Sequence, residues 1–408
     1  MPATPATPAS PPVLLVFSHL RWGFVHQRPQ HLLSRLAGRW RVLFVEEPVH
    51  LPPEDGAARL DAVAVTPELT VLTPHTPVKA PGFHDDQIAV LDALLQDHLD
   101  THGLHVDIAW LYTPMALPLA NRLGADCLVY DCMDELSAFR GAPLQLRQRE
   151  SALLQQAALV LTGGPSLYEA RKALHTNIHC FRSAVDAAHF SPAGLDLTGP
   201  LAREAQALQQ DLPRPRVGFF GVVDERMDVA LIAHLAACHP DWALVMVGPV
   251  VKIDPATLPR PDNIHWLGMR SYELLPYLML GWDLALMPFA LNESTRFISP
   301  TKTLEYMAGG LPVVSTPIHD VVRLYTPAVA VAPAGDEFVQ ACEAVLGEGS
   351  TARRARQRQM AQLVARHSWA DTADAVHALL EEALVGVREA QPALDAEETE
   401  PLPVAVRA

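Results

Sequence analysis

The chain has 408 residues, of which 49% are hydrophobic, and a formal net charge of -15 at pH 7. This length is too great for one ordinary domain and predicts two. The acidic balance argues against nucleic acid as a partner, because such binding depends on Lys and Arg neutralising phosphates. No stretch approaches the roughly 18 apolar residues of a membrane span. The N-terminus also lacks a signal peptide, so the sequence predicts a cytoplasmic protein.

Several kinds of chemistry are excluded by missing motifs. The five cysteines form no C-x-x-C pair and have no histidine at a zinc spacing, which favours buried free thiols and predicts no metal site. Neither a G-x-x-x-x-G-K-[ST] loop nor a G-x-G-x-x-G turn after the first strand is present. A Gly-x-Ser-x-Gly elbow is absent too, so the sequence predicts no P-loop enzyme, dinucleotide dehydrogenase or serine hydrolase.

The first half alternates buried strands with helices. Residues 1–11 are a Pro/Ala/Thr tract that predicts disorder. An apolar run at 13–17, a polar loop at 19–31, helical spacing at 32–37 and a second run at 42–45 form a β-loop-α-β unit. The pattern predicts a doubly wound parallel sheet for a first domain over 12–192.

The second half repeats this pattern after a break. Residues 193–215 are rich in Pro and Gly and predict a linker with one helix, and the alternation restarts for a second domain over 216–368. Ser368 can cap a last helix over 369–386, and the Glu/Ala/Pro-rich residues 388–408 predict disorder. Two α/β domains in sequence place a cleft between them.

The stretch from Ser299 to Thr316 is the most informative part of the chain. Ser299 suits a helix N-cap and Pro300 the first helical position. Lys302 then places a cation in the first turn, where the helix dipole favours an anion such as phosphate. Glu305 lies one turn further on, where a ribose would sit. The alternative is an ordinary solvated Lys/Glu pair.

Further candidate residues follow strands in both halves. Gly221 ends the first strand of the second half, and Arg226 behind it can reach the same phosphates or pair with Asp224 or Asp228. In the first half, the candidates are His19, Arg21, Gln27 and Arg28 in the polar loop, and Asp131 and Asp134 after the strand at 128–130. Ligands of open α/β sheets bind at this carboxyl edge, although these side chains can instead cap helices or support neighbouring loops.

These motifs resemble the two-domain GT-B glycosyltransferases of the retaining family-4 type, also called glycosyl transferase group 1. The stretch Ser299 to Thr316 looks like the family signature Pro-x-Lys-x-x-Glu-Tyr-x-Ala-x-Gly-x-Pro-Val-Val. Residues 221–226 and 182–190 match two other family motifs. The opening FSHLRWGFVHQRPQHLLSRLA resembles a bacterial subgroup that includes teichuronic-acid and other surface-polysaccharide transferases.

The resemblance implies two Rossmann-like domains facing across a cleft, with the last helix crossing back to the first. It implies that Glu305 binds the donor ribose and that Lys302 and Arg226 act catalytically on the diphosphate, with Gly221, Ser299 and Thr301 beside them. The co-substrate would be a UDP- or GDP-sugar, without a metal or other cofactor. The acceptor, a glycan or a lipid-linked sugar, would meet the first domain, and peripheral association with the inner membrane face is left open.

The chain also departs from the family pattern. The family has an acid eight residues before Glu305, where this chain has Phe297, so Asn292 or Arg296 would take over part of the sugar contact. Val222 replaces an arginine that often follows Gly221. Two alternatives therefore stay open: a nucleotide-sugar 2-epimerase using His19, Asp131 and Asp134, and a non-catalytic sugar-nucleotide-binding subunit.

Overall fold

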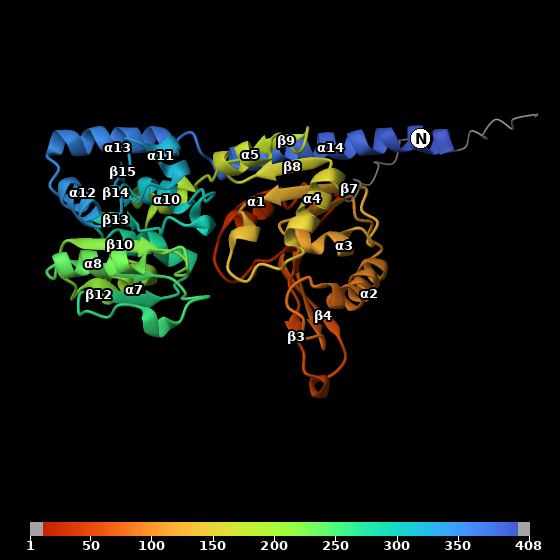
Figure 1. The fold of residues 1–408 in the computed structure, drawn as a ribbon, viewed down its shortest axis with the longest axis horizontal. Coiled ribbons are helices and arrows are strands. Elements are labelled where there is room, and N and C mark those ends of the chain that lie inside the picture. Colours follow the sequence, from red (N-terminus) through yellow and green to blue (C-terminus); the bar gives the residue numbers. More distant parts are fainter. Residues whose placement is uncertain (1–10, 399–408) are drawn as a thin grey trace, which may run out of the picture.

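The structure, a computed structural model, describes residues 11–398, so the disorder predicted for residues 1–10 and 399–408 lies outside the described residues. Two α/β domains lie side by side and are joined along one side by the last two helices (Figure 1). We call them the N-domain and the C-domain. No helix of the described part of the chain is long and apolar enough to cross a membrane.

The N-domain is built on a nine-stranded sheet in the order β3-β5-β2-β1-β6-β7-β8-β9, with β4 paired to β5. All pairs are parallel except β4 with β5. Strands β1, β6 and β8 are buried along their whole length, as the continuous apolar runs predicted. The strands are β1 (Val13–Ser18), β2 (Arg41–Glu46), β3 (Val49–His50), β4 (Arg59–Thr66), β5 (Leu69–Thr76), β6 (Ile108–Leu111), β7 (Cys127–Cys132), β8 (Leu159–Thr162) and β9 (Ile178–Cys180).

Helices connect these parallel strands, because each crossover must return the chain to the same end of the sheet. Helix α1 follows β1 directly, so the loop between them opens at the carboxyl edge of the sheet. The helices of this half are α1 (Arg28–Leu36), α2 (Asp85–His102), α3 (Leu117–Ala120), α4 (Leu146–Gln156), α5 (Pro165–Arg171) and α6 (Ala187–Phe190).

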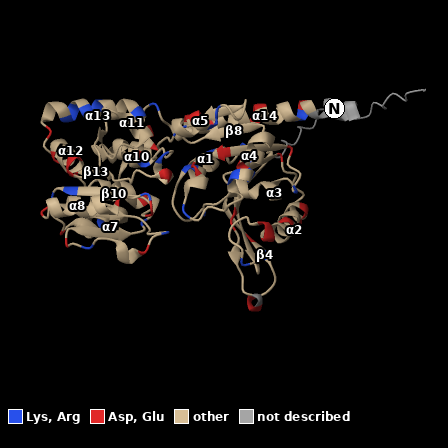
Figure 2. Cartoon of the chain, in the orientation of Figure 1, with Lys and Arg blue, Asp and Glu red and all other residues tan. Residues whose placement is uncertain are grey.

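The C-domain has a parallel six-stranded sheet in the order β12-β11-β10-β13-β14-β15. Its strands are β10 (Arg216–Phe220), β11 (Ala243–Val247), β12 (Ile264–Gly268), β13 (Leu284–Met287), β14 (Val313–Ser315) and β15 (Ala330–Val331). Its helices are α7 (Pro200–Gln209), α8 (Val229–Cys238), α9 (Leu275–Met279), α10 (Lys302–Ala308), α11 (His319–Tyr325), α12 (Asp336–Leu346) and α13 (Ser350–Val364). Figure 2 shows Lys and Arg along α13 and acidic residues spread over both domains.

The last helix, α14 (Trp369–Glu398), returns to the N-domain as predicted. Ser368 caps it by accepting hydrogen bonds from the backbone N–H groups of Ala370 and Asp371. Trp369, Val376 and Leu380 are buried in the N-domain core beside α1. The disorder predicted for 388–398 is wrong, because these residues continue the helix; Ala, Glu and Leu are strong helix formers. The predicted class, two doubly wound parallel sheets facing across a cleft, is confirmed.

Candidate active site

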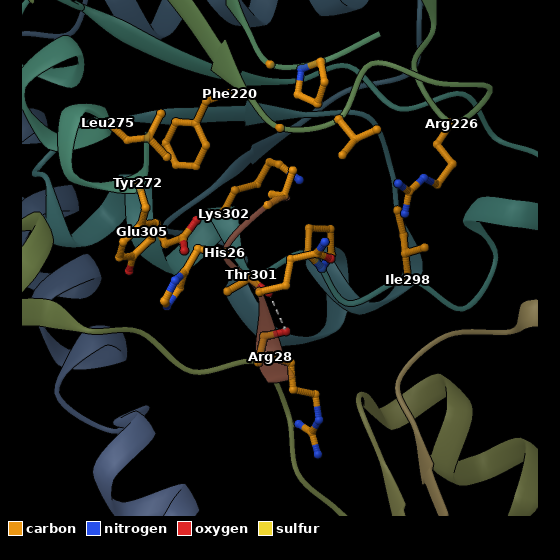
Figure 3. Close-up of a pocket in the computed structure, with 18 of the residues that line it drawn as sticks. His26, Arg28, Phe220, Arg226, Tyr272, Leu275, Ile298, Thr301, Lys302 and Glu305 are labelled. Atoms are coloured by element: carbon orange, nitrogen blue, oxygen red, sulfur yellow. Dashed lines mark hydrogen bonds between the residues drawn. The ribbon is translucent and has the colours of Figure 1, made fainter. Parts of the chain in front are cut away.

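The cleft between the domains holds a cavity of about 190 Å³. The end of β10 and the start of α10 form one side, the C-domain wall, and the loops after β1 and β7 form the other, the N-domain wall (Figure 3). Its polar and aromatic lining residues are Phe24, His26, Gln27, Arg28, Asp134, Ser183, Phe220, Arg226, Arg270, Tyr272, Phe289, Ser299, Thr301, Lys302 and Glu305.

Two glycines let the backbone approach the cavity closely. Gly221, which follows β10, has φ +141°, and a Cβ there would lie 2.8 Å from Cε of Lys302. Gly248, which follows β11, has φ +143°, and a Cβ there would lie 1.8 Å from the Gly221 carbonyl oxygen. Both positions need glycine for conformation and for space. The predicted site residue Gly221 thus lies directly against Lys302.

Helix α10 begins two residues later than the sequence indicated. Ser299 is not its N-cap, because the helix starts at Lys302 and Thr301 occupies the capping position. The Ser299 carbonyl instead accepts a hydrogen bond of 2.7 Å from Oγ of Ser183 in the N-domain half of the chain. Thr301 also donates to Ser183, over 3.3 Å (Figure 3). Ser299 and Thr301 line the cavity and tie its two walls together.

Lys302 carries its charge into the cavity without a carboxylate partner. Its ammonium group lies 5.6 Å from the ring of Phe219 and 5.2 Å from that of Phe289, and it forms no ion pair with any residue of 11–398. Burial and the nearby Arg226 lower the pKa of Lys302 to about 8, because both disfavour the charged form. An anion in the cavity would relieve this cost.

Arg226 is held in a fixed orientation on the same wall. Its guanidinium donates to both carboxylate oxygens of Asp224, with distances of 3.0, 3.1 and 2.7 Å, and stacks 5.4 Å from the ring of Phe139. Burial opposes the charge of Arg226, yet the bonds to Asp224 outweigh it and raise the pKa. Arg226 thus pairs with Asp224, as one sequence interpretation predicted, and also lines the cavity, while its contact with phosphates stays a prediction.

Glu305 lies one turn along α10 from Lys302 and is only 5% exposed. Burial raises its pKa to about 7, and the neighbouring Lys302 opposes that rise. A buried carboxylate in this state needs hydrogen-bond donors, such as the hydroxyl groups of a ligand. Glu305 therefore adds an acceptor next to the two cations.

Asn292 and Arg296, the predicted substitutes for the missing acid, do not line the cavity. Both are exposed. Asn292 caps a short helical turn and donates to the Glu225 carbonyl, whereas Arg296 lies 5.1 Å from the ring of Phe297. The structure therefore does not bring Asn292 and Arg296 to the candidate site, and their predicted contact with the sugar stays without support from the cavity. Phe297 itself packs against the N-domain core.

Arg28 and Asp131 meet each other inside the N-domain. Nε of Arg28 donates to Asp131 over 2.9 Å, and Nη1 donates to the Phe181 carbonyl over 2.8 Å. Asp131 is fully buried and lies outside the cavity lining, whereas Arg28 reaches the lining from the start of α1. This pair joins α1 to β7, so its charges are largely used in holding the fold.

The other N-domain candidates divide between the cavity and its surroundings. Gln27 and Asp134 line the cavity, and burial raises the pKa of Asp134, although Arg226 nearby lowers it. His19 and Arg21 do not line the cavity. Burial lowers the pKa of His19 to about 4, so it is neutral, and Arg21 pairs with Glu46 over 2.9 Å at the end of β2.

Sequence reasoning missed an aromatic group at one end of the cavity. Tyr272, just after β12, stacks on His26 of the N-domain with ring centroids 4.2 Å apart. His189 stacks on Tyr272 at 4.1 Å. The position of Tyr272 at the carboxyl edge of the sheet was a usable signal, because ligands bind at that edge. Arg226 and Lys252 both lie over the ring of Phe139. Apart from its place in a loop, no feature of the sequence indicated that Phe139 would contact these cations.

The arrangement defines a class of protein. Two parallel-sheet domains face each other across a cleft, cations and a buried carboxylate stand at the carboxyl edge of the second sheet, and the last helix returns to the first domain. This is the GT-B fold of glycosyltransferases. Solved structures with the same fold include sucrose-phosphate synthase (tll1590) from Thermosynechococcus elongatus, with TM-score 0.70 and 14% identity over 92% of this chain and 100% of that one.

A structure of Anabaena Alr3699/HepE in complex with UDP and glucose has the same fold, with TM-score 0.62 and 17% identity over 90% of this chain and 99% of that chain. Residues 214–348 match the family model "Glycosyl transferases group 1". The chain therefore has the GT-B fold that the resemblance predicted, and its residues 214–348 are similar to the group 1 family.

Among curated proteins, the chain is similar to TuaH of Bacillus subtilis (strain 168), which is named as a glycosyltransferase of teichuronic acid biosynthesis. The two are 27% identical over 263 residues. The match covers 58% of this chain and spans 63% of the length of TuaH. The predicted resemblance to the teichuronic-acid subgroup thus rests on a relative as well as on the opening motif.

Proposed function

We propose that this protein is a retaining glycosyltransferase that moves a sugar from a nucleotide-diphosphate sugar, a UDP- or GDP-sugar, to a glycan or lipid-linked acceptor. The observation that carries the proposal is Lys302, a cation without a carboxylate partner, beside Arg226 and Glu305 in an interdomain cleft. The group 1 family match supports the class of reaction. The class of donor is supported by HepE, which has the same fold and was solved in complex with UDP.

The proposed reaction breaks the bond between the anomeric carbon and the diphosphate oxygen and forms a bond from that carbon to an acceptor oxygen. The diphosphate leaves with the electron pair of the broken bond, and the proton of the acceptor hydroxyl passes to an oxygen of the departing diphosphate. Negative charge therefore develops where Lys302 and Arg226 stand. Cations held in place before the reaction stabilise such charge most effectively, and Asp224 fixes Arg226 in this way.

The remaining elements of the proposal concern the setting of the reaction. The name of TuaH supports surface polysaccharide assembly as the pathway and an acceptor from that pathway. We place the reaction in the cytoplasm, with peripheral contact to the inner membrane face where lipid-linked acceptors are available. We also propose that neutralisation by Lys302 and Arg226 replaces a divalent metal, a point that activity in the presence of EDTA would test.

A non-catalytic nucleotide-sugar-binding role is the second candidate. It is favoured by Phe297, which stands in place of the family acid and packs against the N-domain core. The 2-epimerase alternative has less support, since His19 and Asp131 lie outside the cavity lining.

A panel of UDP-, GDP-, TDP- and ADP-sugars would test the proposal by thermal shift. We expect one group of nucleotides to raise the melting temperature, and slow donor hydrolysis to accompany binding. Proton NMR of the transferred sugar would then report the anomeric configuration, which we expect to be retained. No shift with any donor would contradict the proposal, and binding without hydrolysis or transfer would favour the non-catalytic role.

A further inference from the structure

Three rings from three parts of the chain form a stack at one end of the cavity. Tyr272 of the C-domain lies between His26, in the loop after β1, and His189, at the end of α6. The ring planes are nearly parallel, with angles of 18° and 3° to Tyr272. One face of Tyr272 therefore turns toward His26 and the opposite face toward His189.

The two histidines are fixed differently. Nε2 of His189 lies 3.1 Å from the Tyr272 carbonyl oxygen, and His189 does not line the cavity. His26 lines the cavity, is exposed, and has no hydrogen bond or ion pair from its side chain to any residue of 11–398. Ring contacts alone hold His26 on Tyr272, so it can leave at low cost when the domains separate.

The order of side chains along the cavity matches the parts of a nucleoside diphosphate. Figure 3 shows Tyr272 and His26 next to Glu305, then Lys302, then Arg226. Their electrostatic effects follow the same order. Glu305 affects the pKa of Tyr272, and Lys302 affects the pKa of Glu305. Arg226 in turn affects the pKa of Lys302. A diphosphate at the cations and a ribose at Glu305 would carry a base to Tyr272.

The present cavity is small for a whole nucleotide sugar. Its volume of about 190 Å³ is below the roughly 300 Å³ at which ligand pockets begin. A nucleotide sugar can therefore enter only if the cleft widens. His26 belongs to the N-domain and Tyr272 to the C-domain, whereas α6 packs its Phe190 into the C-domain core against Phe220. Widening would therefore separate His26 from Tyr272, leave His189 in place and expose one face of Tyr272.

We propose that Tyr272 is the stacking platform for the base of the donor nucleotide, and that His26 covers this platform until the nucleotide displaces it. The proposal rests on the proposed function and adds the residue that recognises the base. Aromatic stacking tolerates any base, because every base has a π-face. The platform thus contributes affinity, and groups at the base edge decide between uracil and guanine.

Calorimetric titration of the full chain with UDP, GDP and inorganic pyrophosphate would test this inference. We expect Tyr272→Leu to weaken binding of the preferred nucleoside diphosphate about tenfold and to leave pyrophosphate binding unchanged, since stacking is worth a factor of this order. Tyr272→Phe keeps the ring and should bind like the unaltered chain. His26→Ala should tighten nucleotide binding about threefold, because it removes the competing ring.

His189→Ala is the matched control, since it empties the other face of the same tyrosine and should leave nucleotide affinity unchanged. Equal losses of nucleotide and pyrophosphate in Tyr272→Leu would assign Tyr272 a structural role and overturn the inference. Weaker nucleotide binding in His26→Ala would overturn the displacement. If the unaltered chain binds neither UDP nor GDP, the proposed function fails first; if it binds them and Tyr272→Leu binds equally well, only this inference fails.

Discussion

The two walls of the cleft use their charged residues in different ways. On the C-domain wall, Lys302 has no carboxylate partner and Glu305 is buried beside it, so both are available to a ligand. On the N-domain wall, Arg28 pairs with Asp131 and Arg21 pairs with Glu46. Similar charged residues near one cavity are thus left unpaired on one side and paired within the fold on the other.

This difference shows that a sequence pattern predicts how two charged residues are arranged when both lie in one local element, and not when they are far apart in the chain. Lys302 and Glu305 lie on one helix, and the helical repeat fixes their relation. Arg28 and Asp131 are 103 residues apart, and they meet only because β1, β6 and β7 are neighbours in the sheet. A charged residue in a polar loop can look free in the sequence while its partner lies far along the chain.

The largest expected effect is on stability and comes from the N-domain wall. Arg28→Met leaves the carboxylate of Asp131 buried without its partner, which typically costs about 3–5 kcal/mol. Urea denaturation would measure this loss. Arg21→Met, which breaks a more exposed pair with Glu46, should cost about 0.2–1 kcal/mol. The double variant Arg28→Met/Asp131→Asn should recover much of the lost stability, because no buried carboxylate is then left unpaired. If Arg28→Met were as stable as the unaltered chain, the Arg28–Asp131 pair would not be needed for folding, and the proposed difference between the two walls would be wrong.

Lys302→Met should weaken nucleoside diphosphate binding at least about a hundredfold, because one of two cations facing the diphosphate is removed. The melting temperature should not fall, since the charged form of Lys302 is disfavoured in the empty cavity. Calorimetry and thermal unfolding together test this. Lys172→Met, at an exposed surface lysine, is the control and should change neither quantity. A large loss of stability in Lys302→Met would support a purely structural role.

The pH dependence of binding should report the same residue. A diphosphate favours charged Lys302, so the pKa of about 8 in the empty cavity must rise on binding. The contribution of Lys302 to affinity should therefore be constant below pH 8, and affinity should fall by up to about tenfold per pH unit above it, until the pKa of the complex is reached. Lys302→Arg keeps its charge throughout and should not show this fall above pH 8. A flat profile in the unaltered chain would contradict the assignment.

Asp224→Asn should have a smaller effect, about a fivefold loss of nucleoside diphosphate affinity. The amide can no longer accept two charge-assisted hydrogen bonds from Arg226, so the guanidinium loses its fixed orientation. Asp336→Asn, at an exposed acid that contacts His234, is the comparison variant. A lower melting temperature with unchanged affinity would assign Asp224 to folding alone.

Arg296→Ala should change nucleotide affinity less than about twofold, because Arg296 is exposed and turned away from the cavity. Only its contact with the Phe297 ring is lost, which is worth about 0.5–1 kcal/mol at an exposed site. Titration with the preferred donor is sufficient. A tenfold loss would restore Arg296 to the donor site and show that the cleft rearranges on binding.

The sequence by itself determined the class of the fold and indicated the core of the candidate site. Continuous apolar runs between helical segments are sufficient for parallel sheets, since strands buried on both faces have this pattern. Lys302, Glu305 and Gly221 were identified because each lies in a local motif whose geometry follows from one helix or one turn. The extent of α14 and the start of α10 were less well defined, as element boundaries often are.

Only the tertiary structure decided which charges are paired and which side chains meet across the cleft. Arg28 met Asp131, Arg296 and Asn292 turned outward, and Tyr272 met His26 because two separate sheets place their carboxyl edges face to face. Such contacts depend on the relative placement of elements tens to hundreds of residues apart. Their physical origin is the packing of whole domains, which no local pattern of residues records.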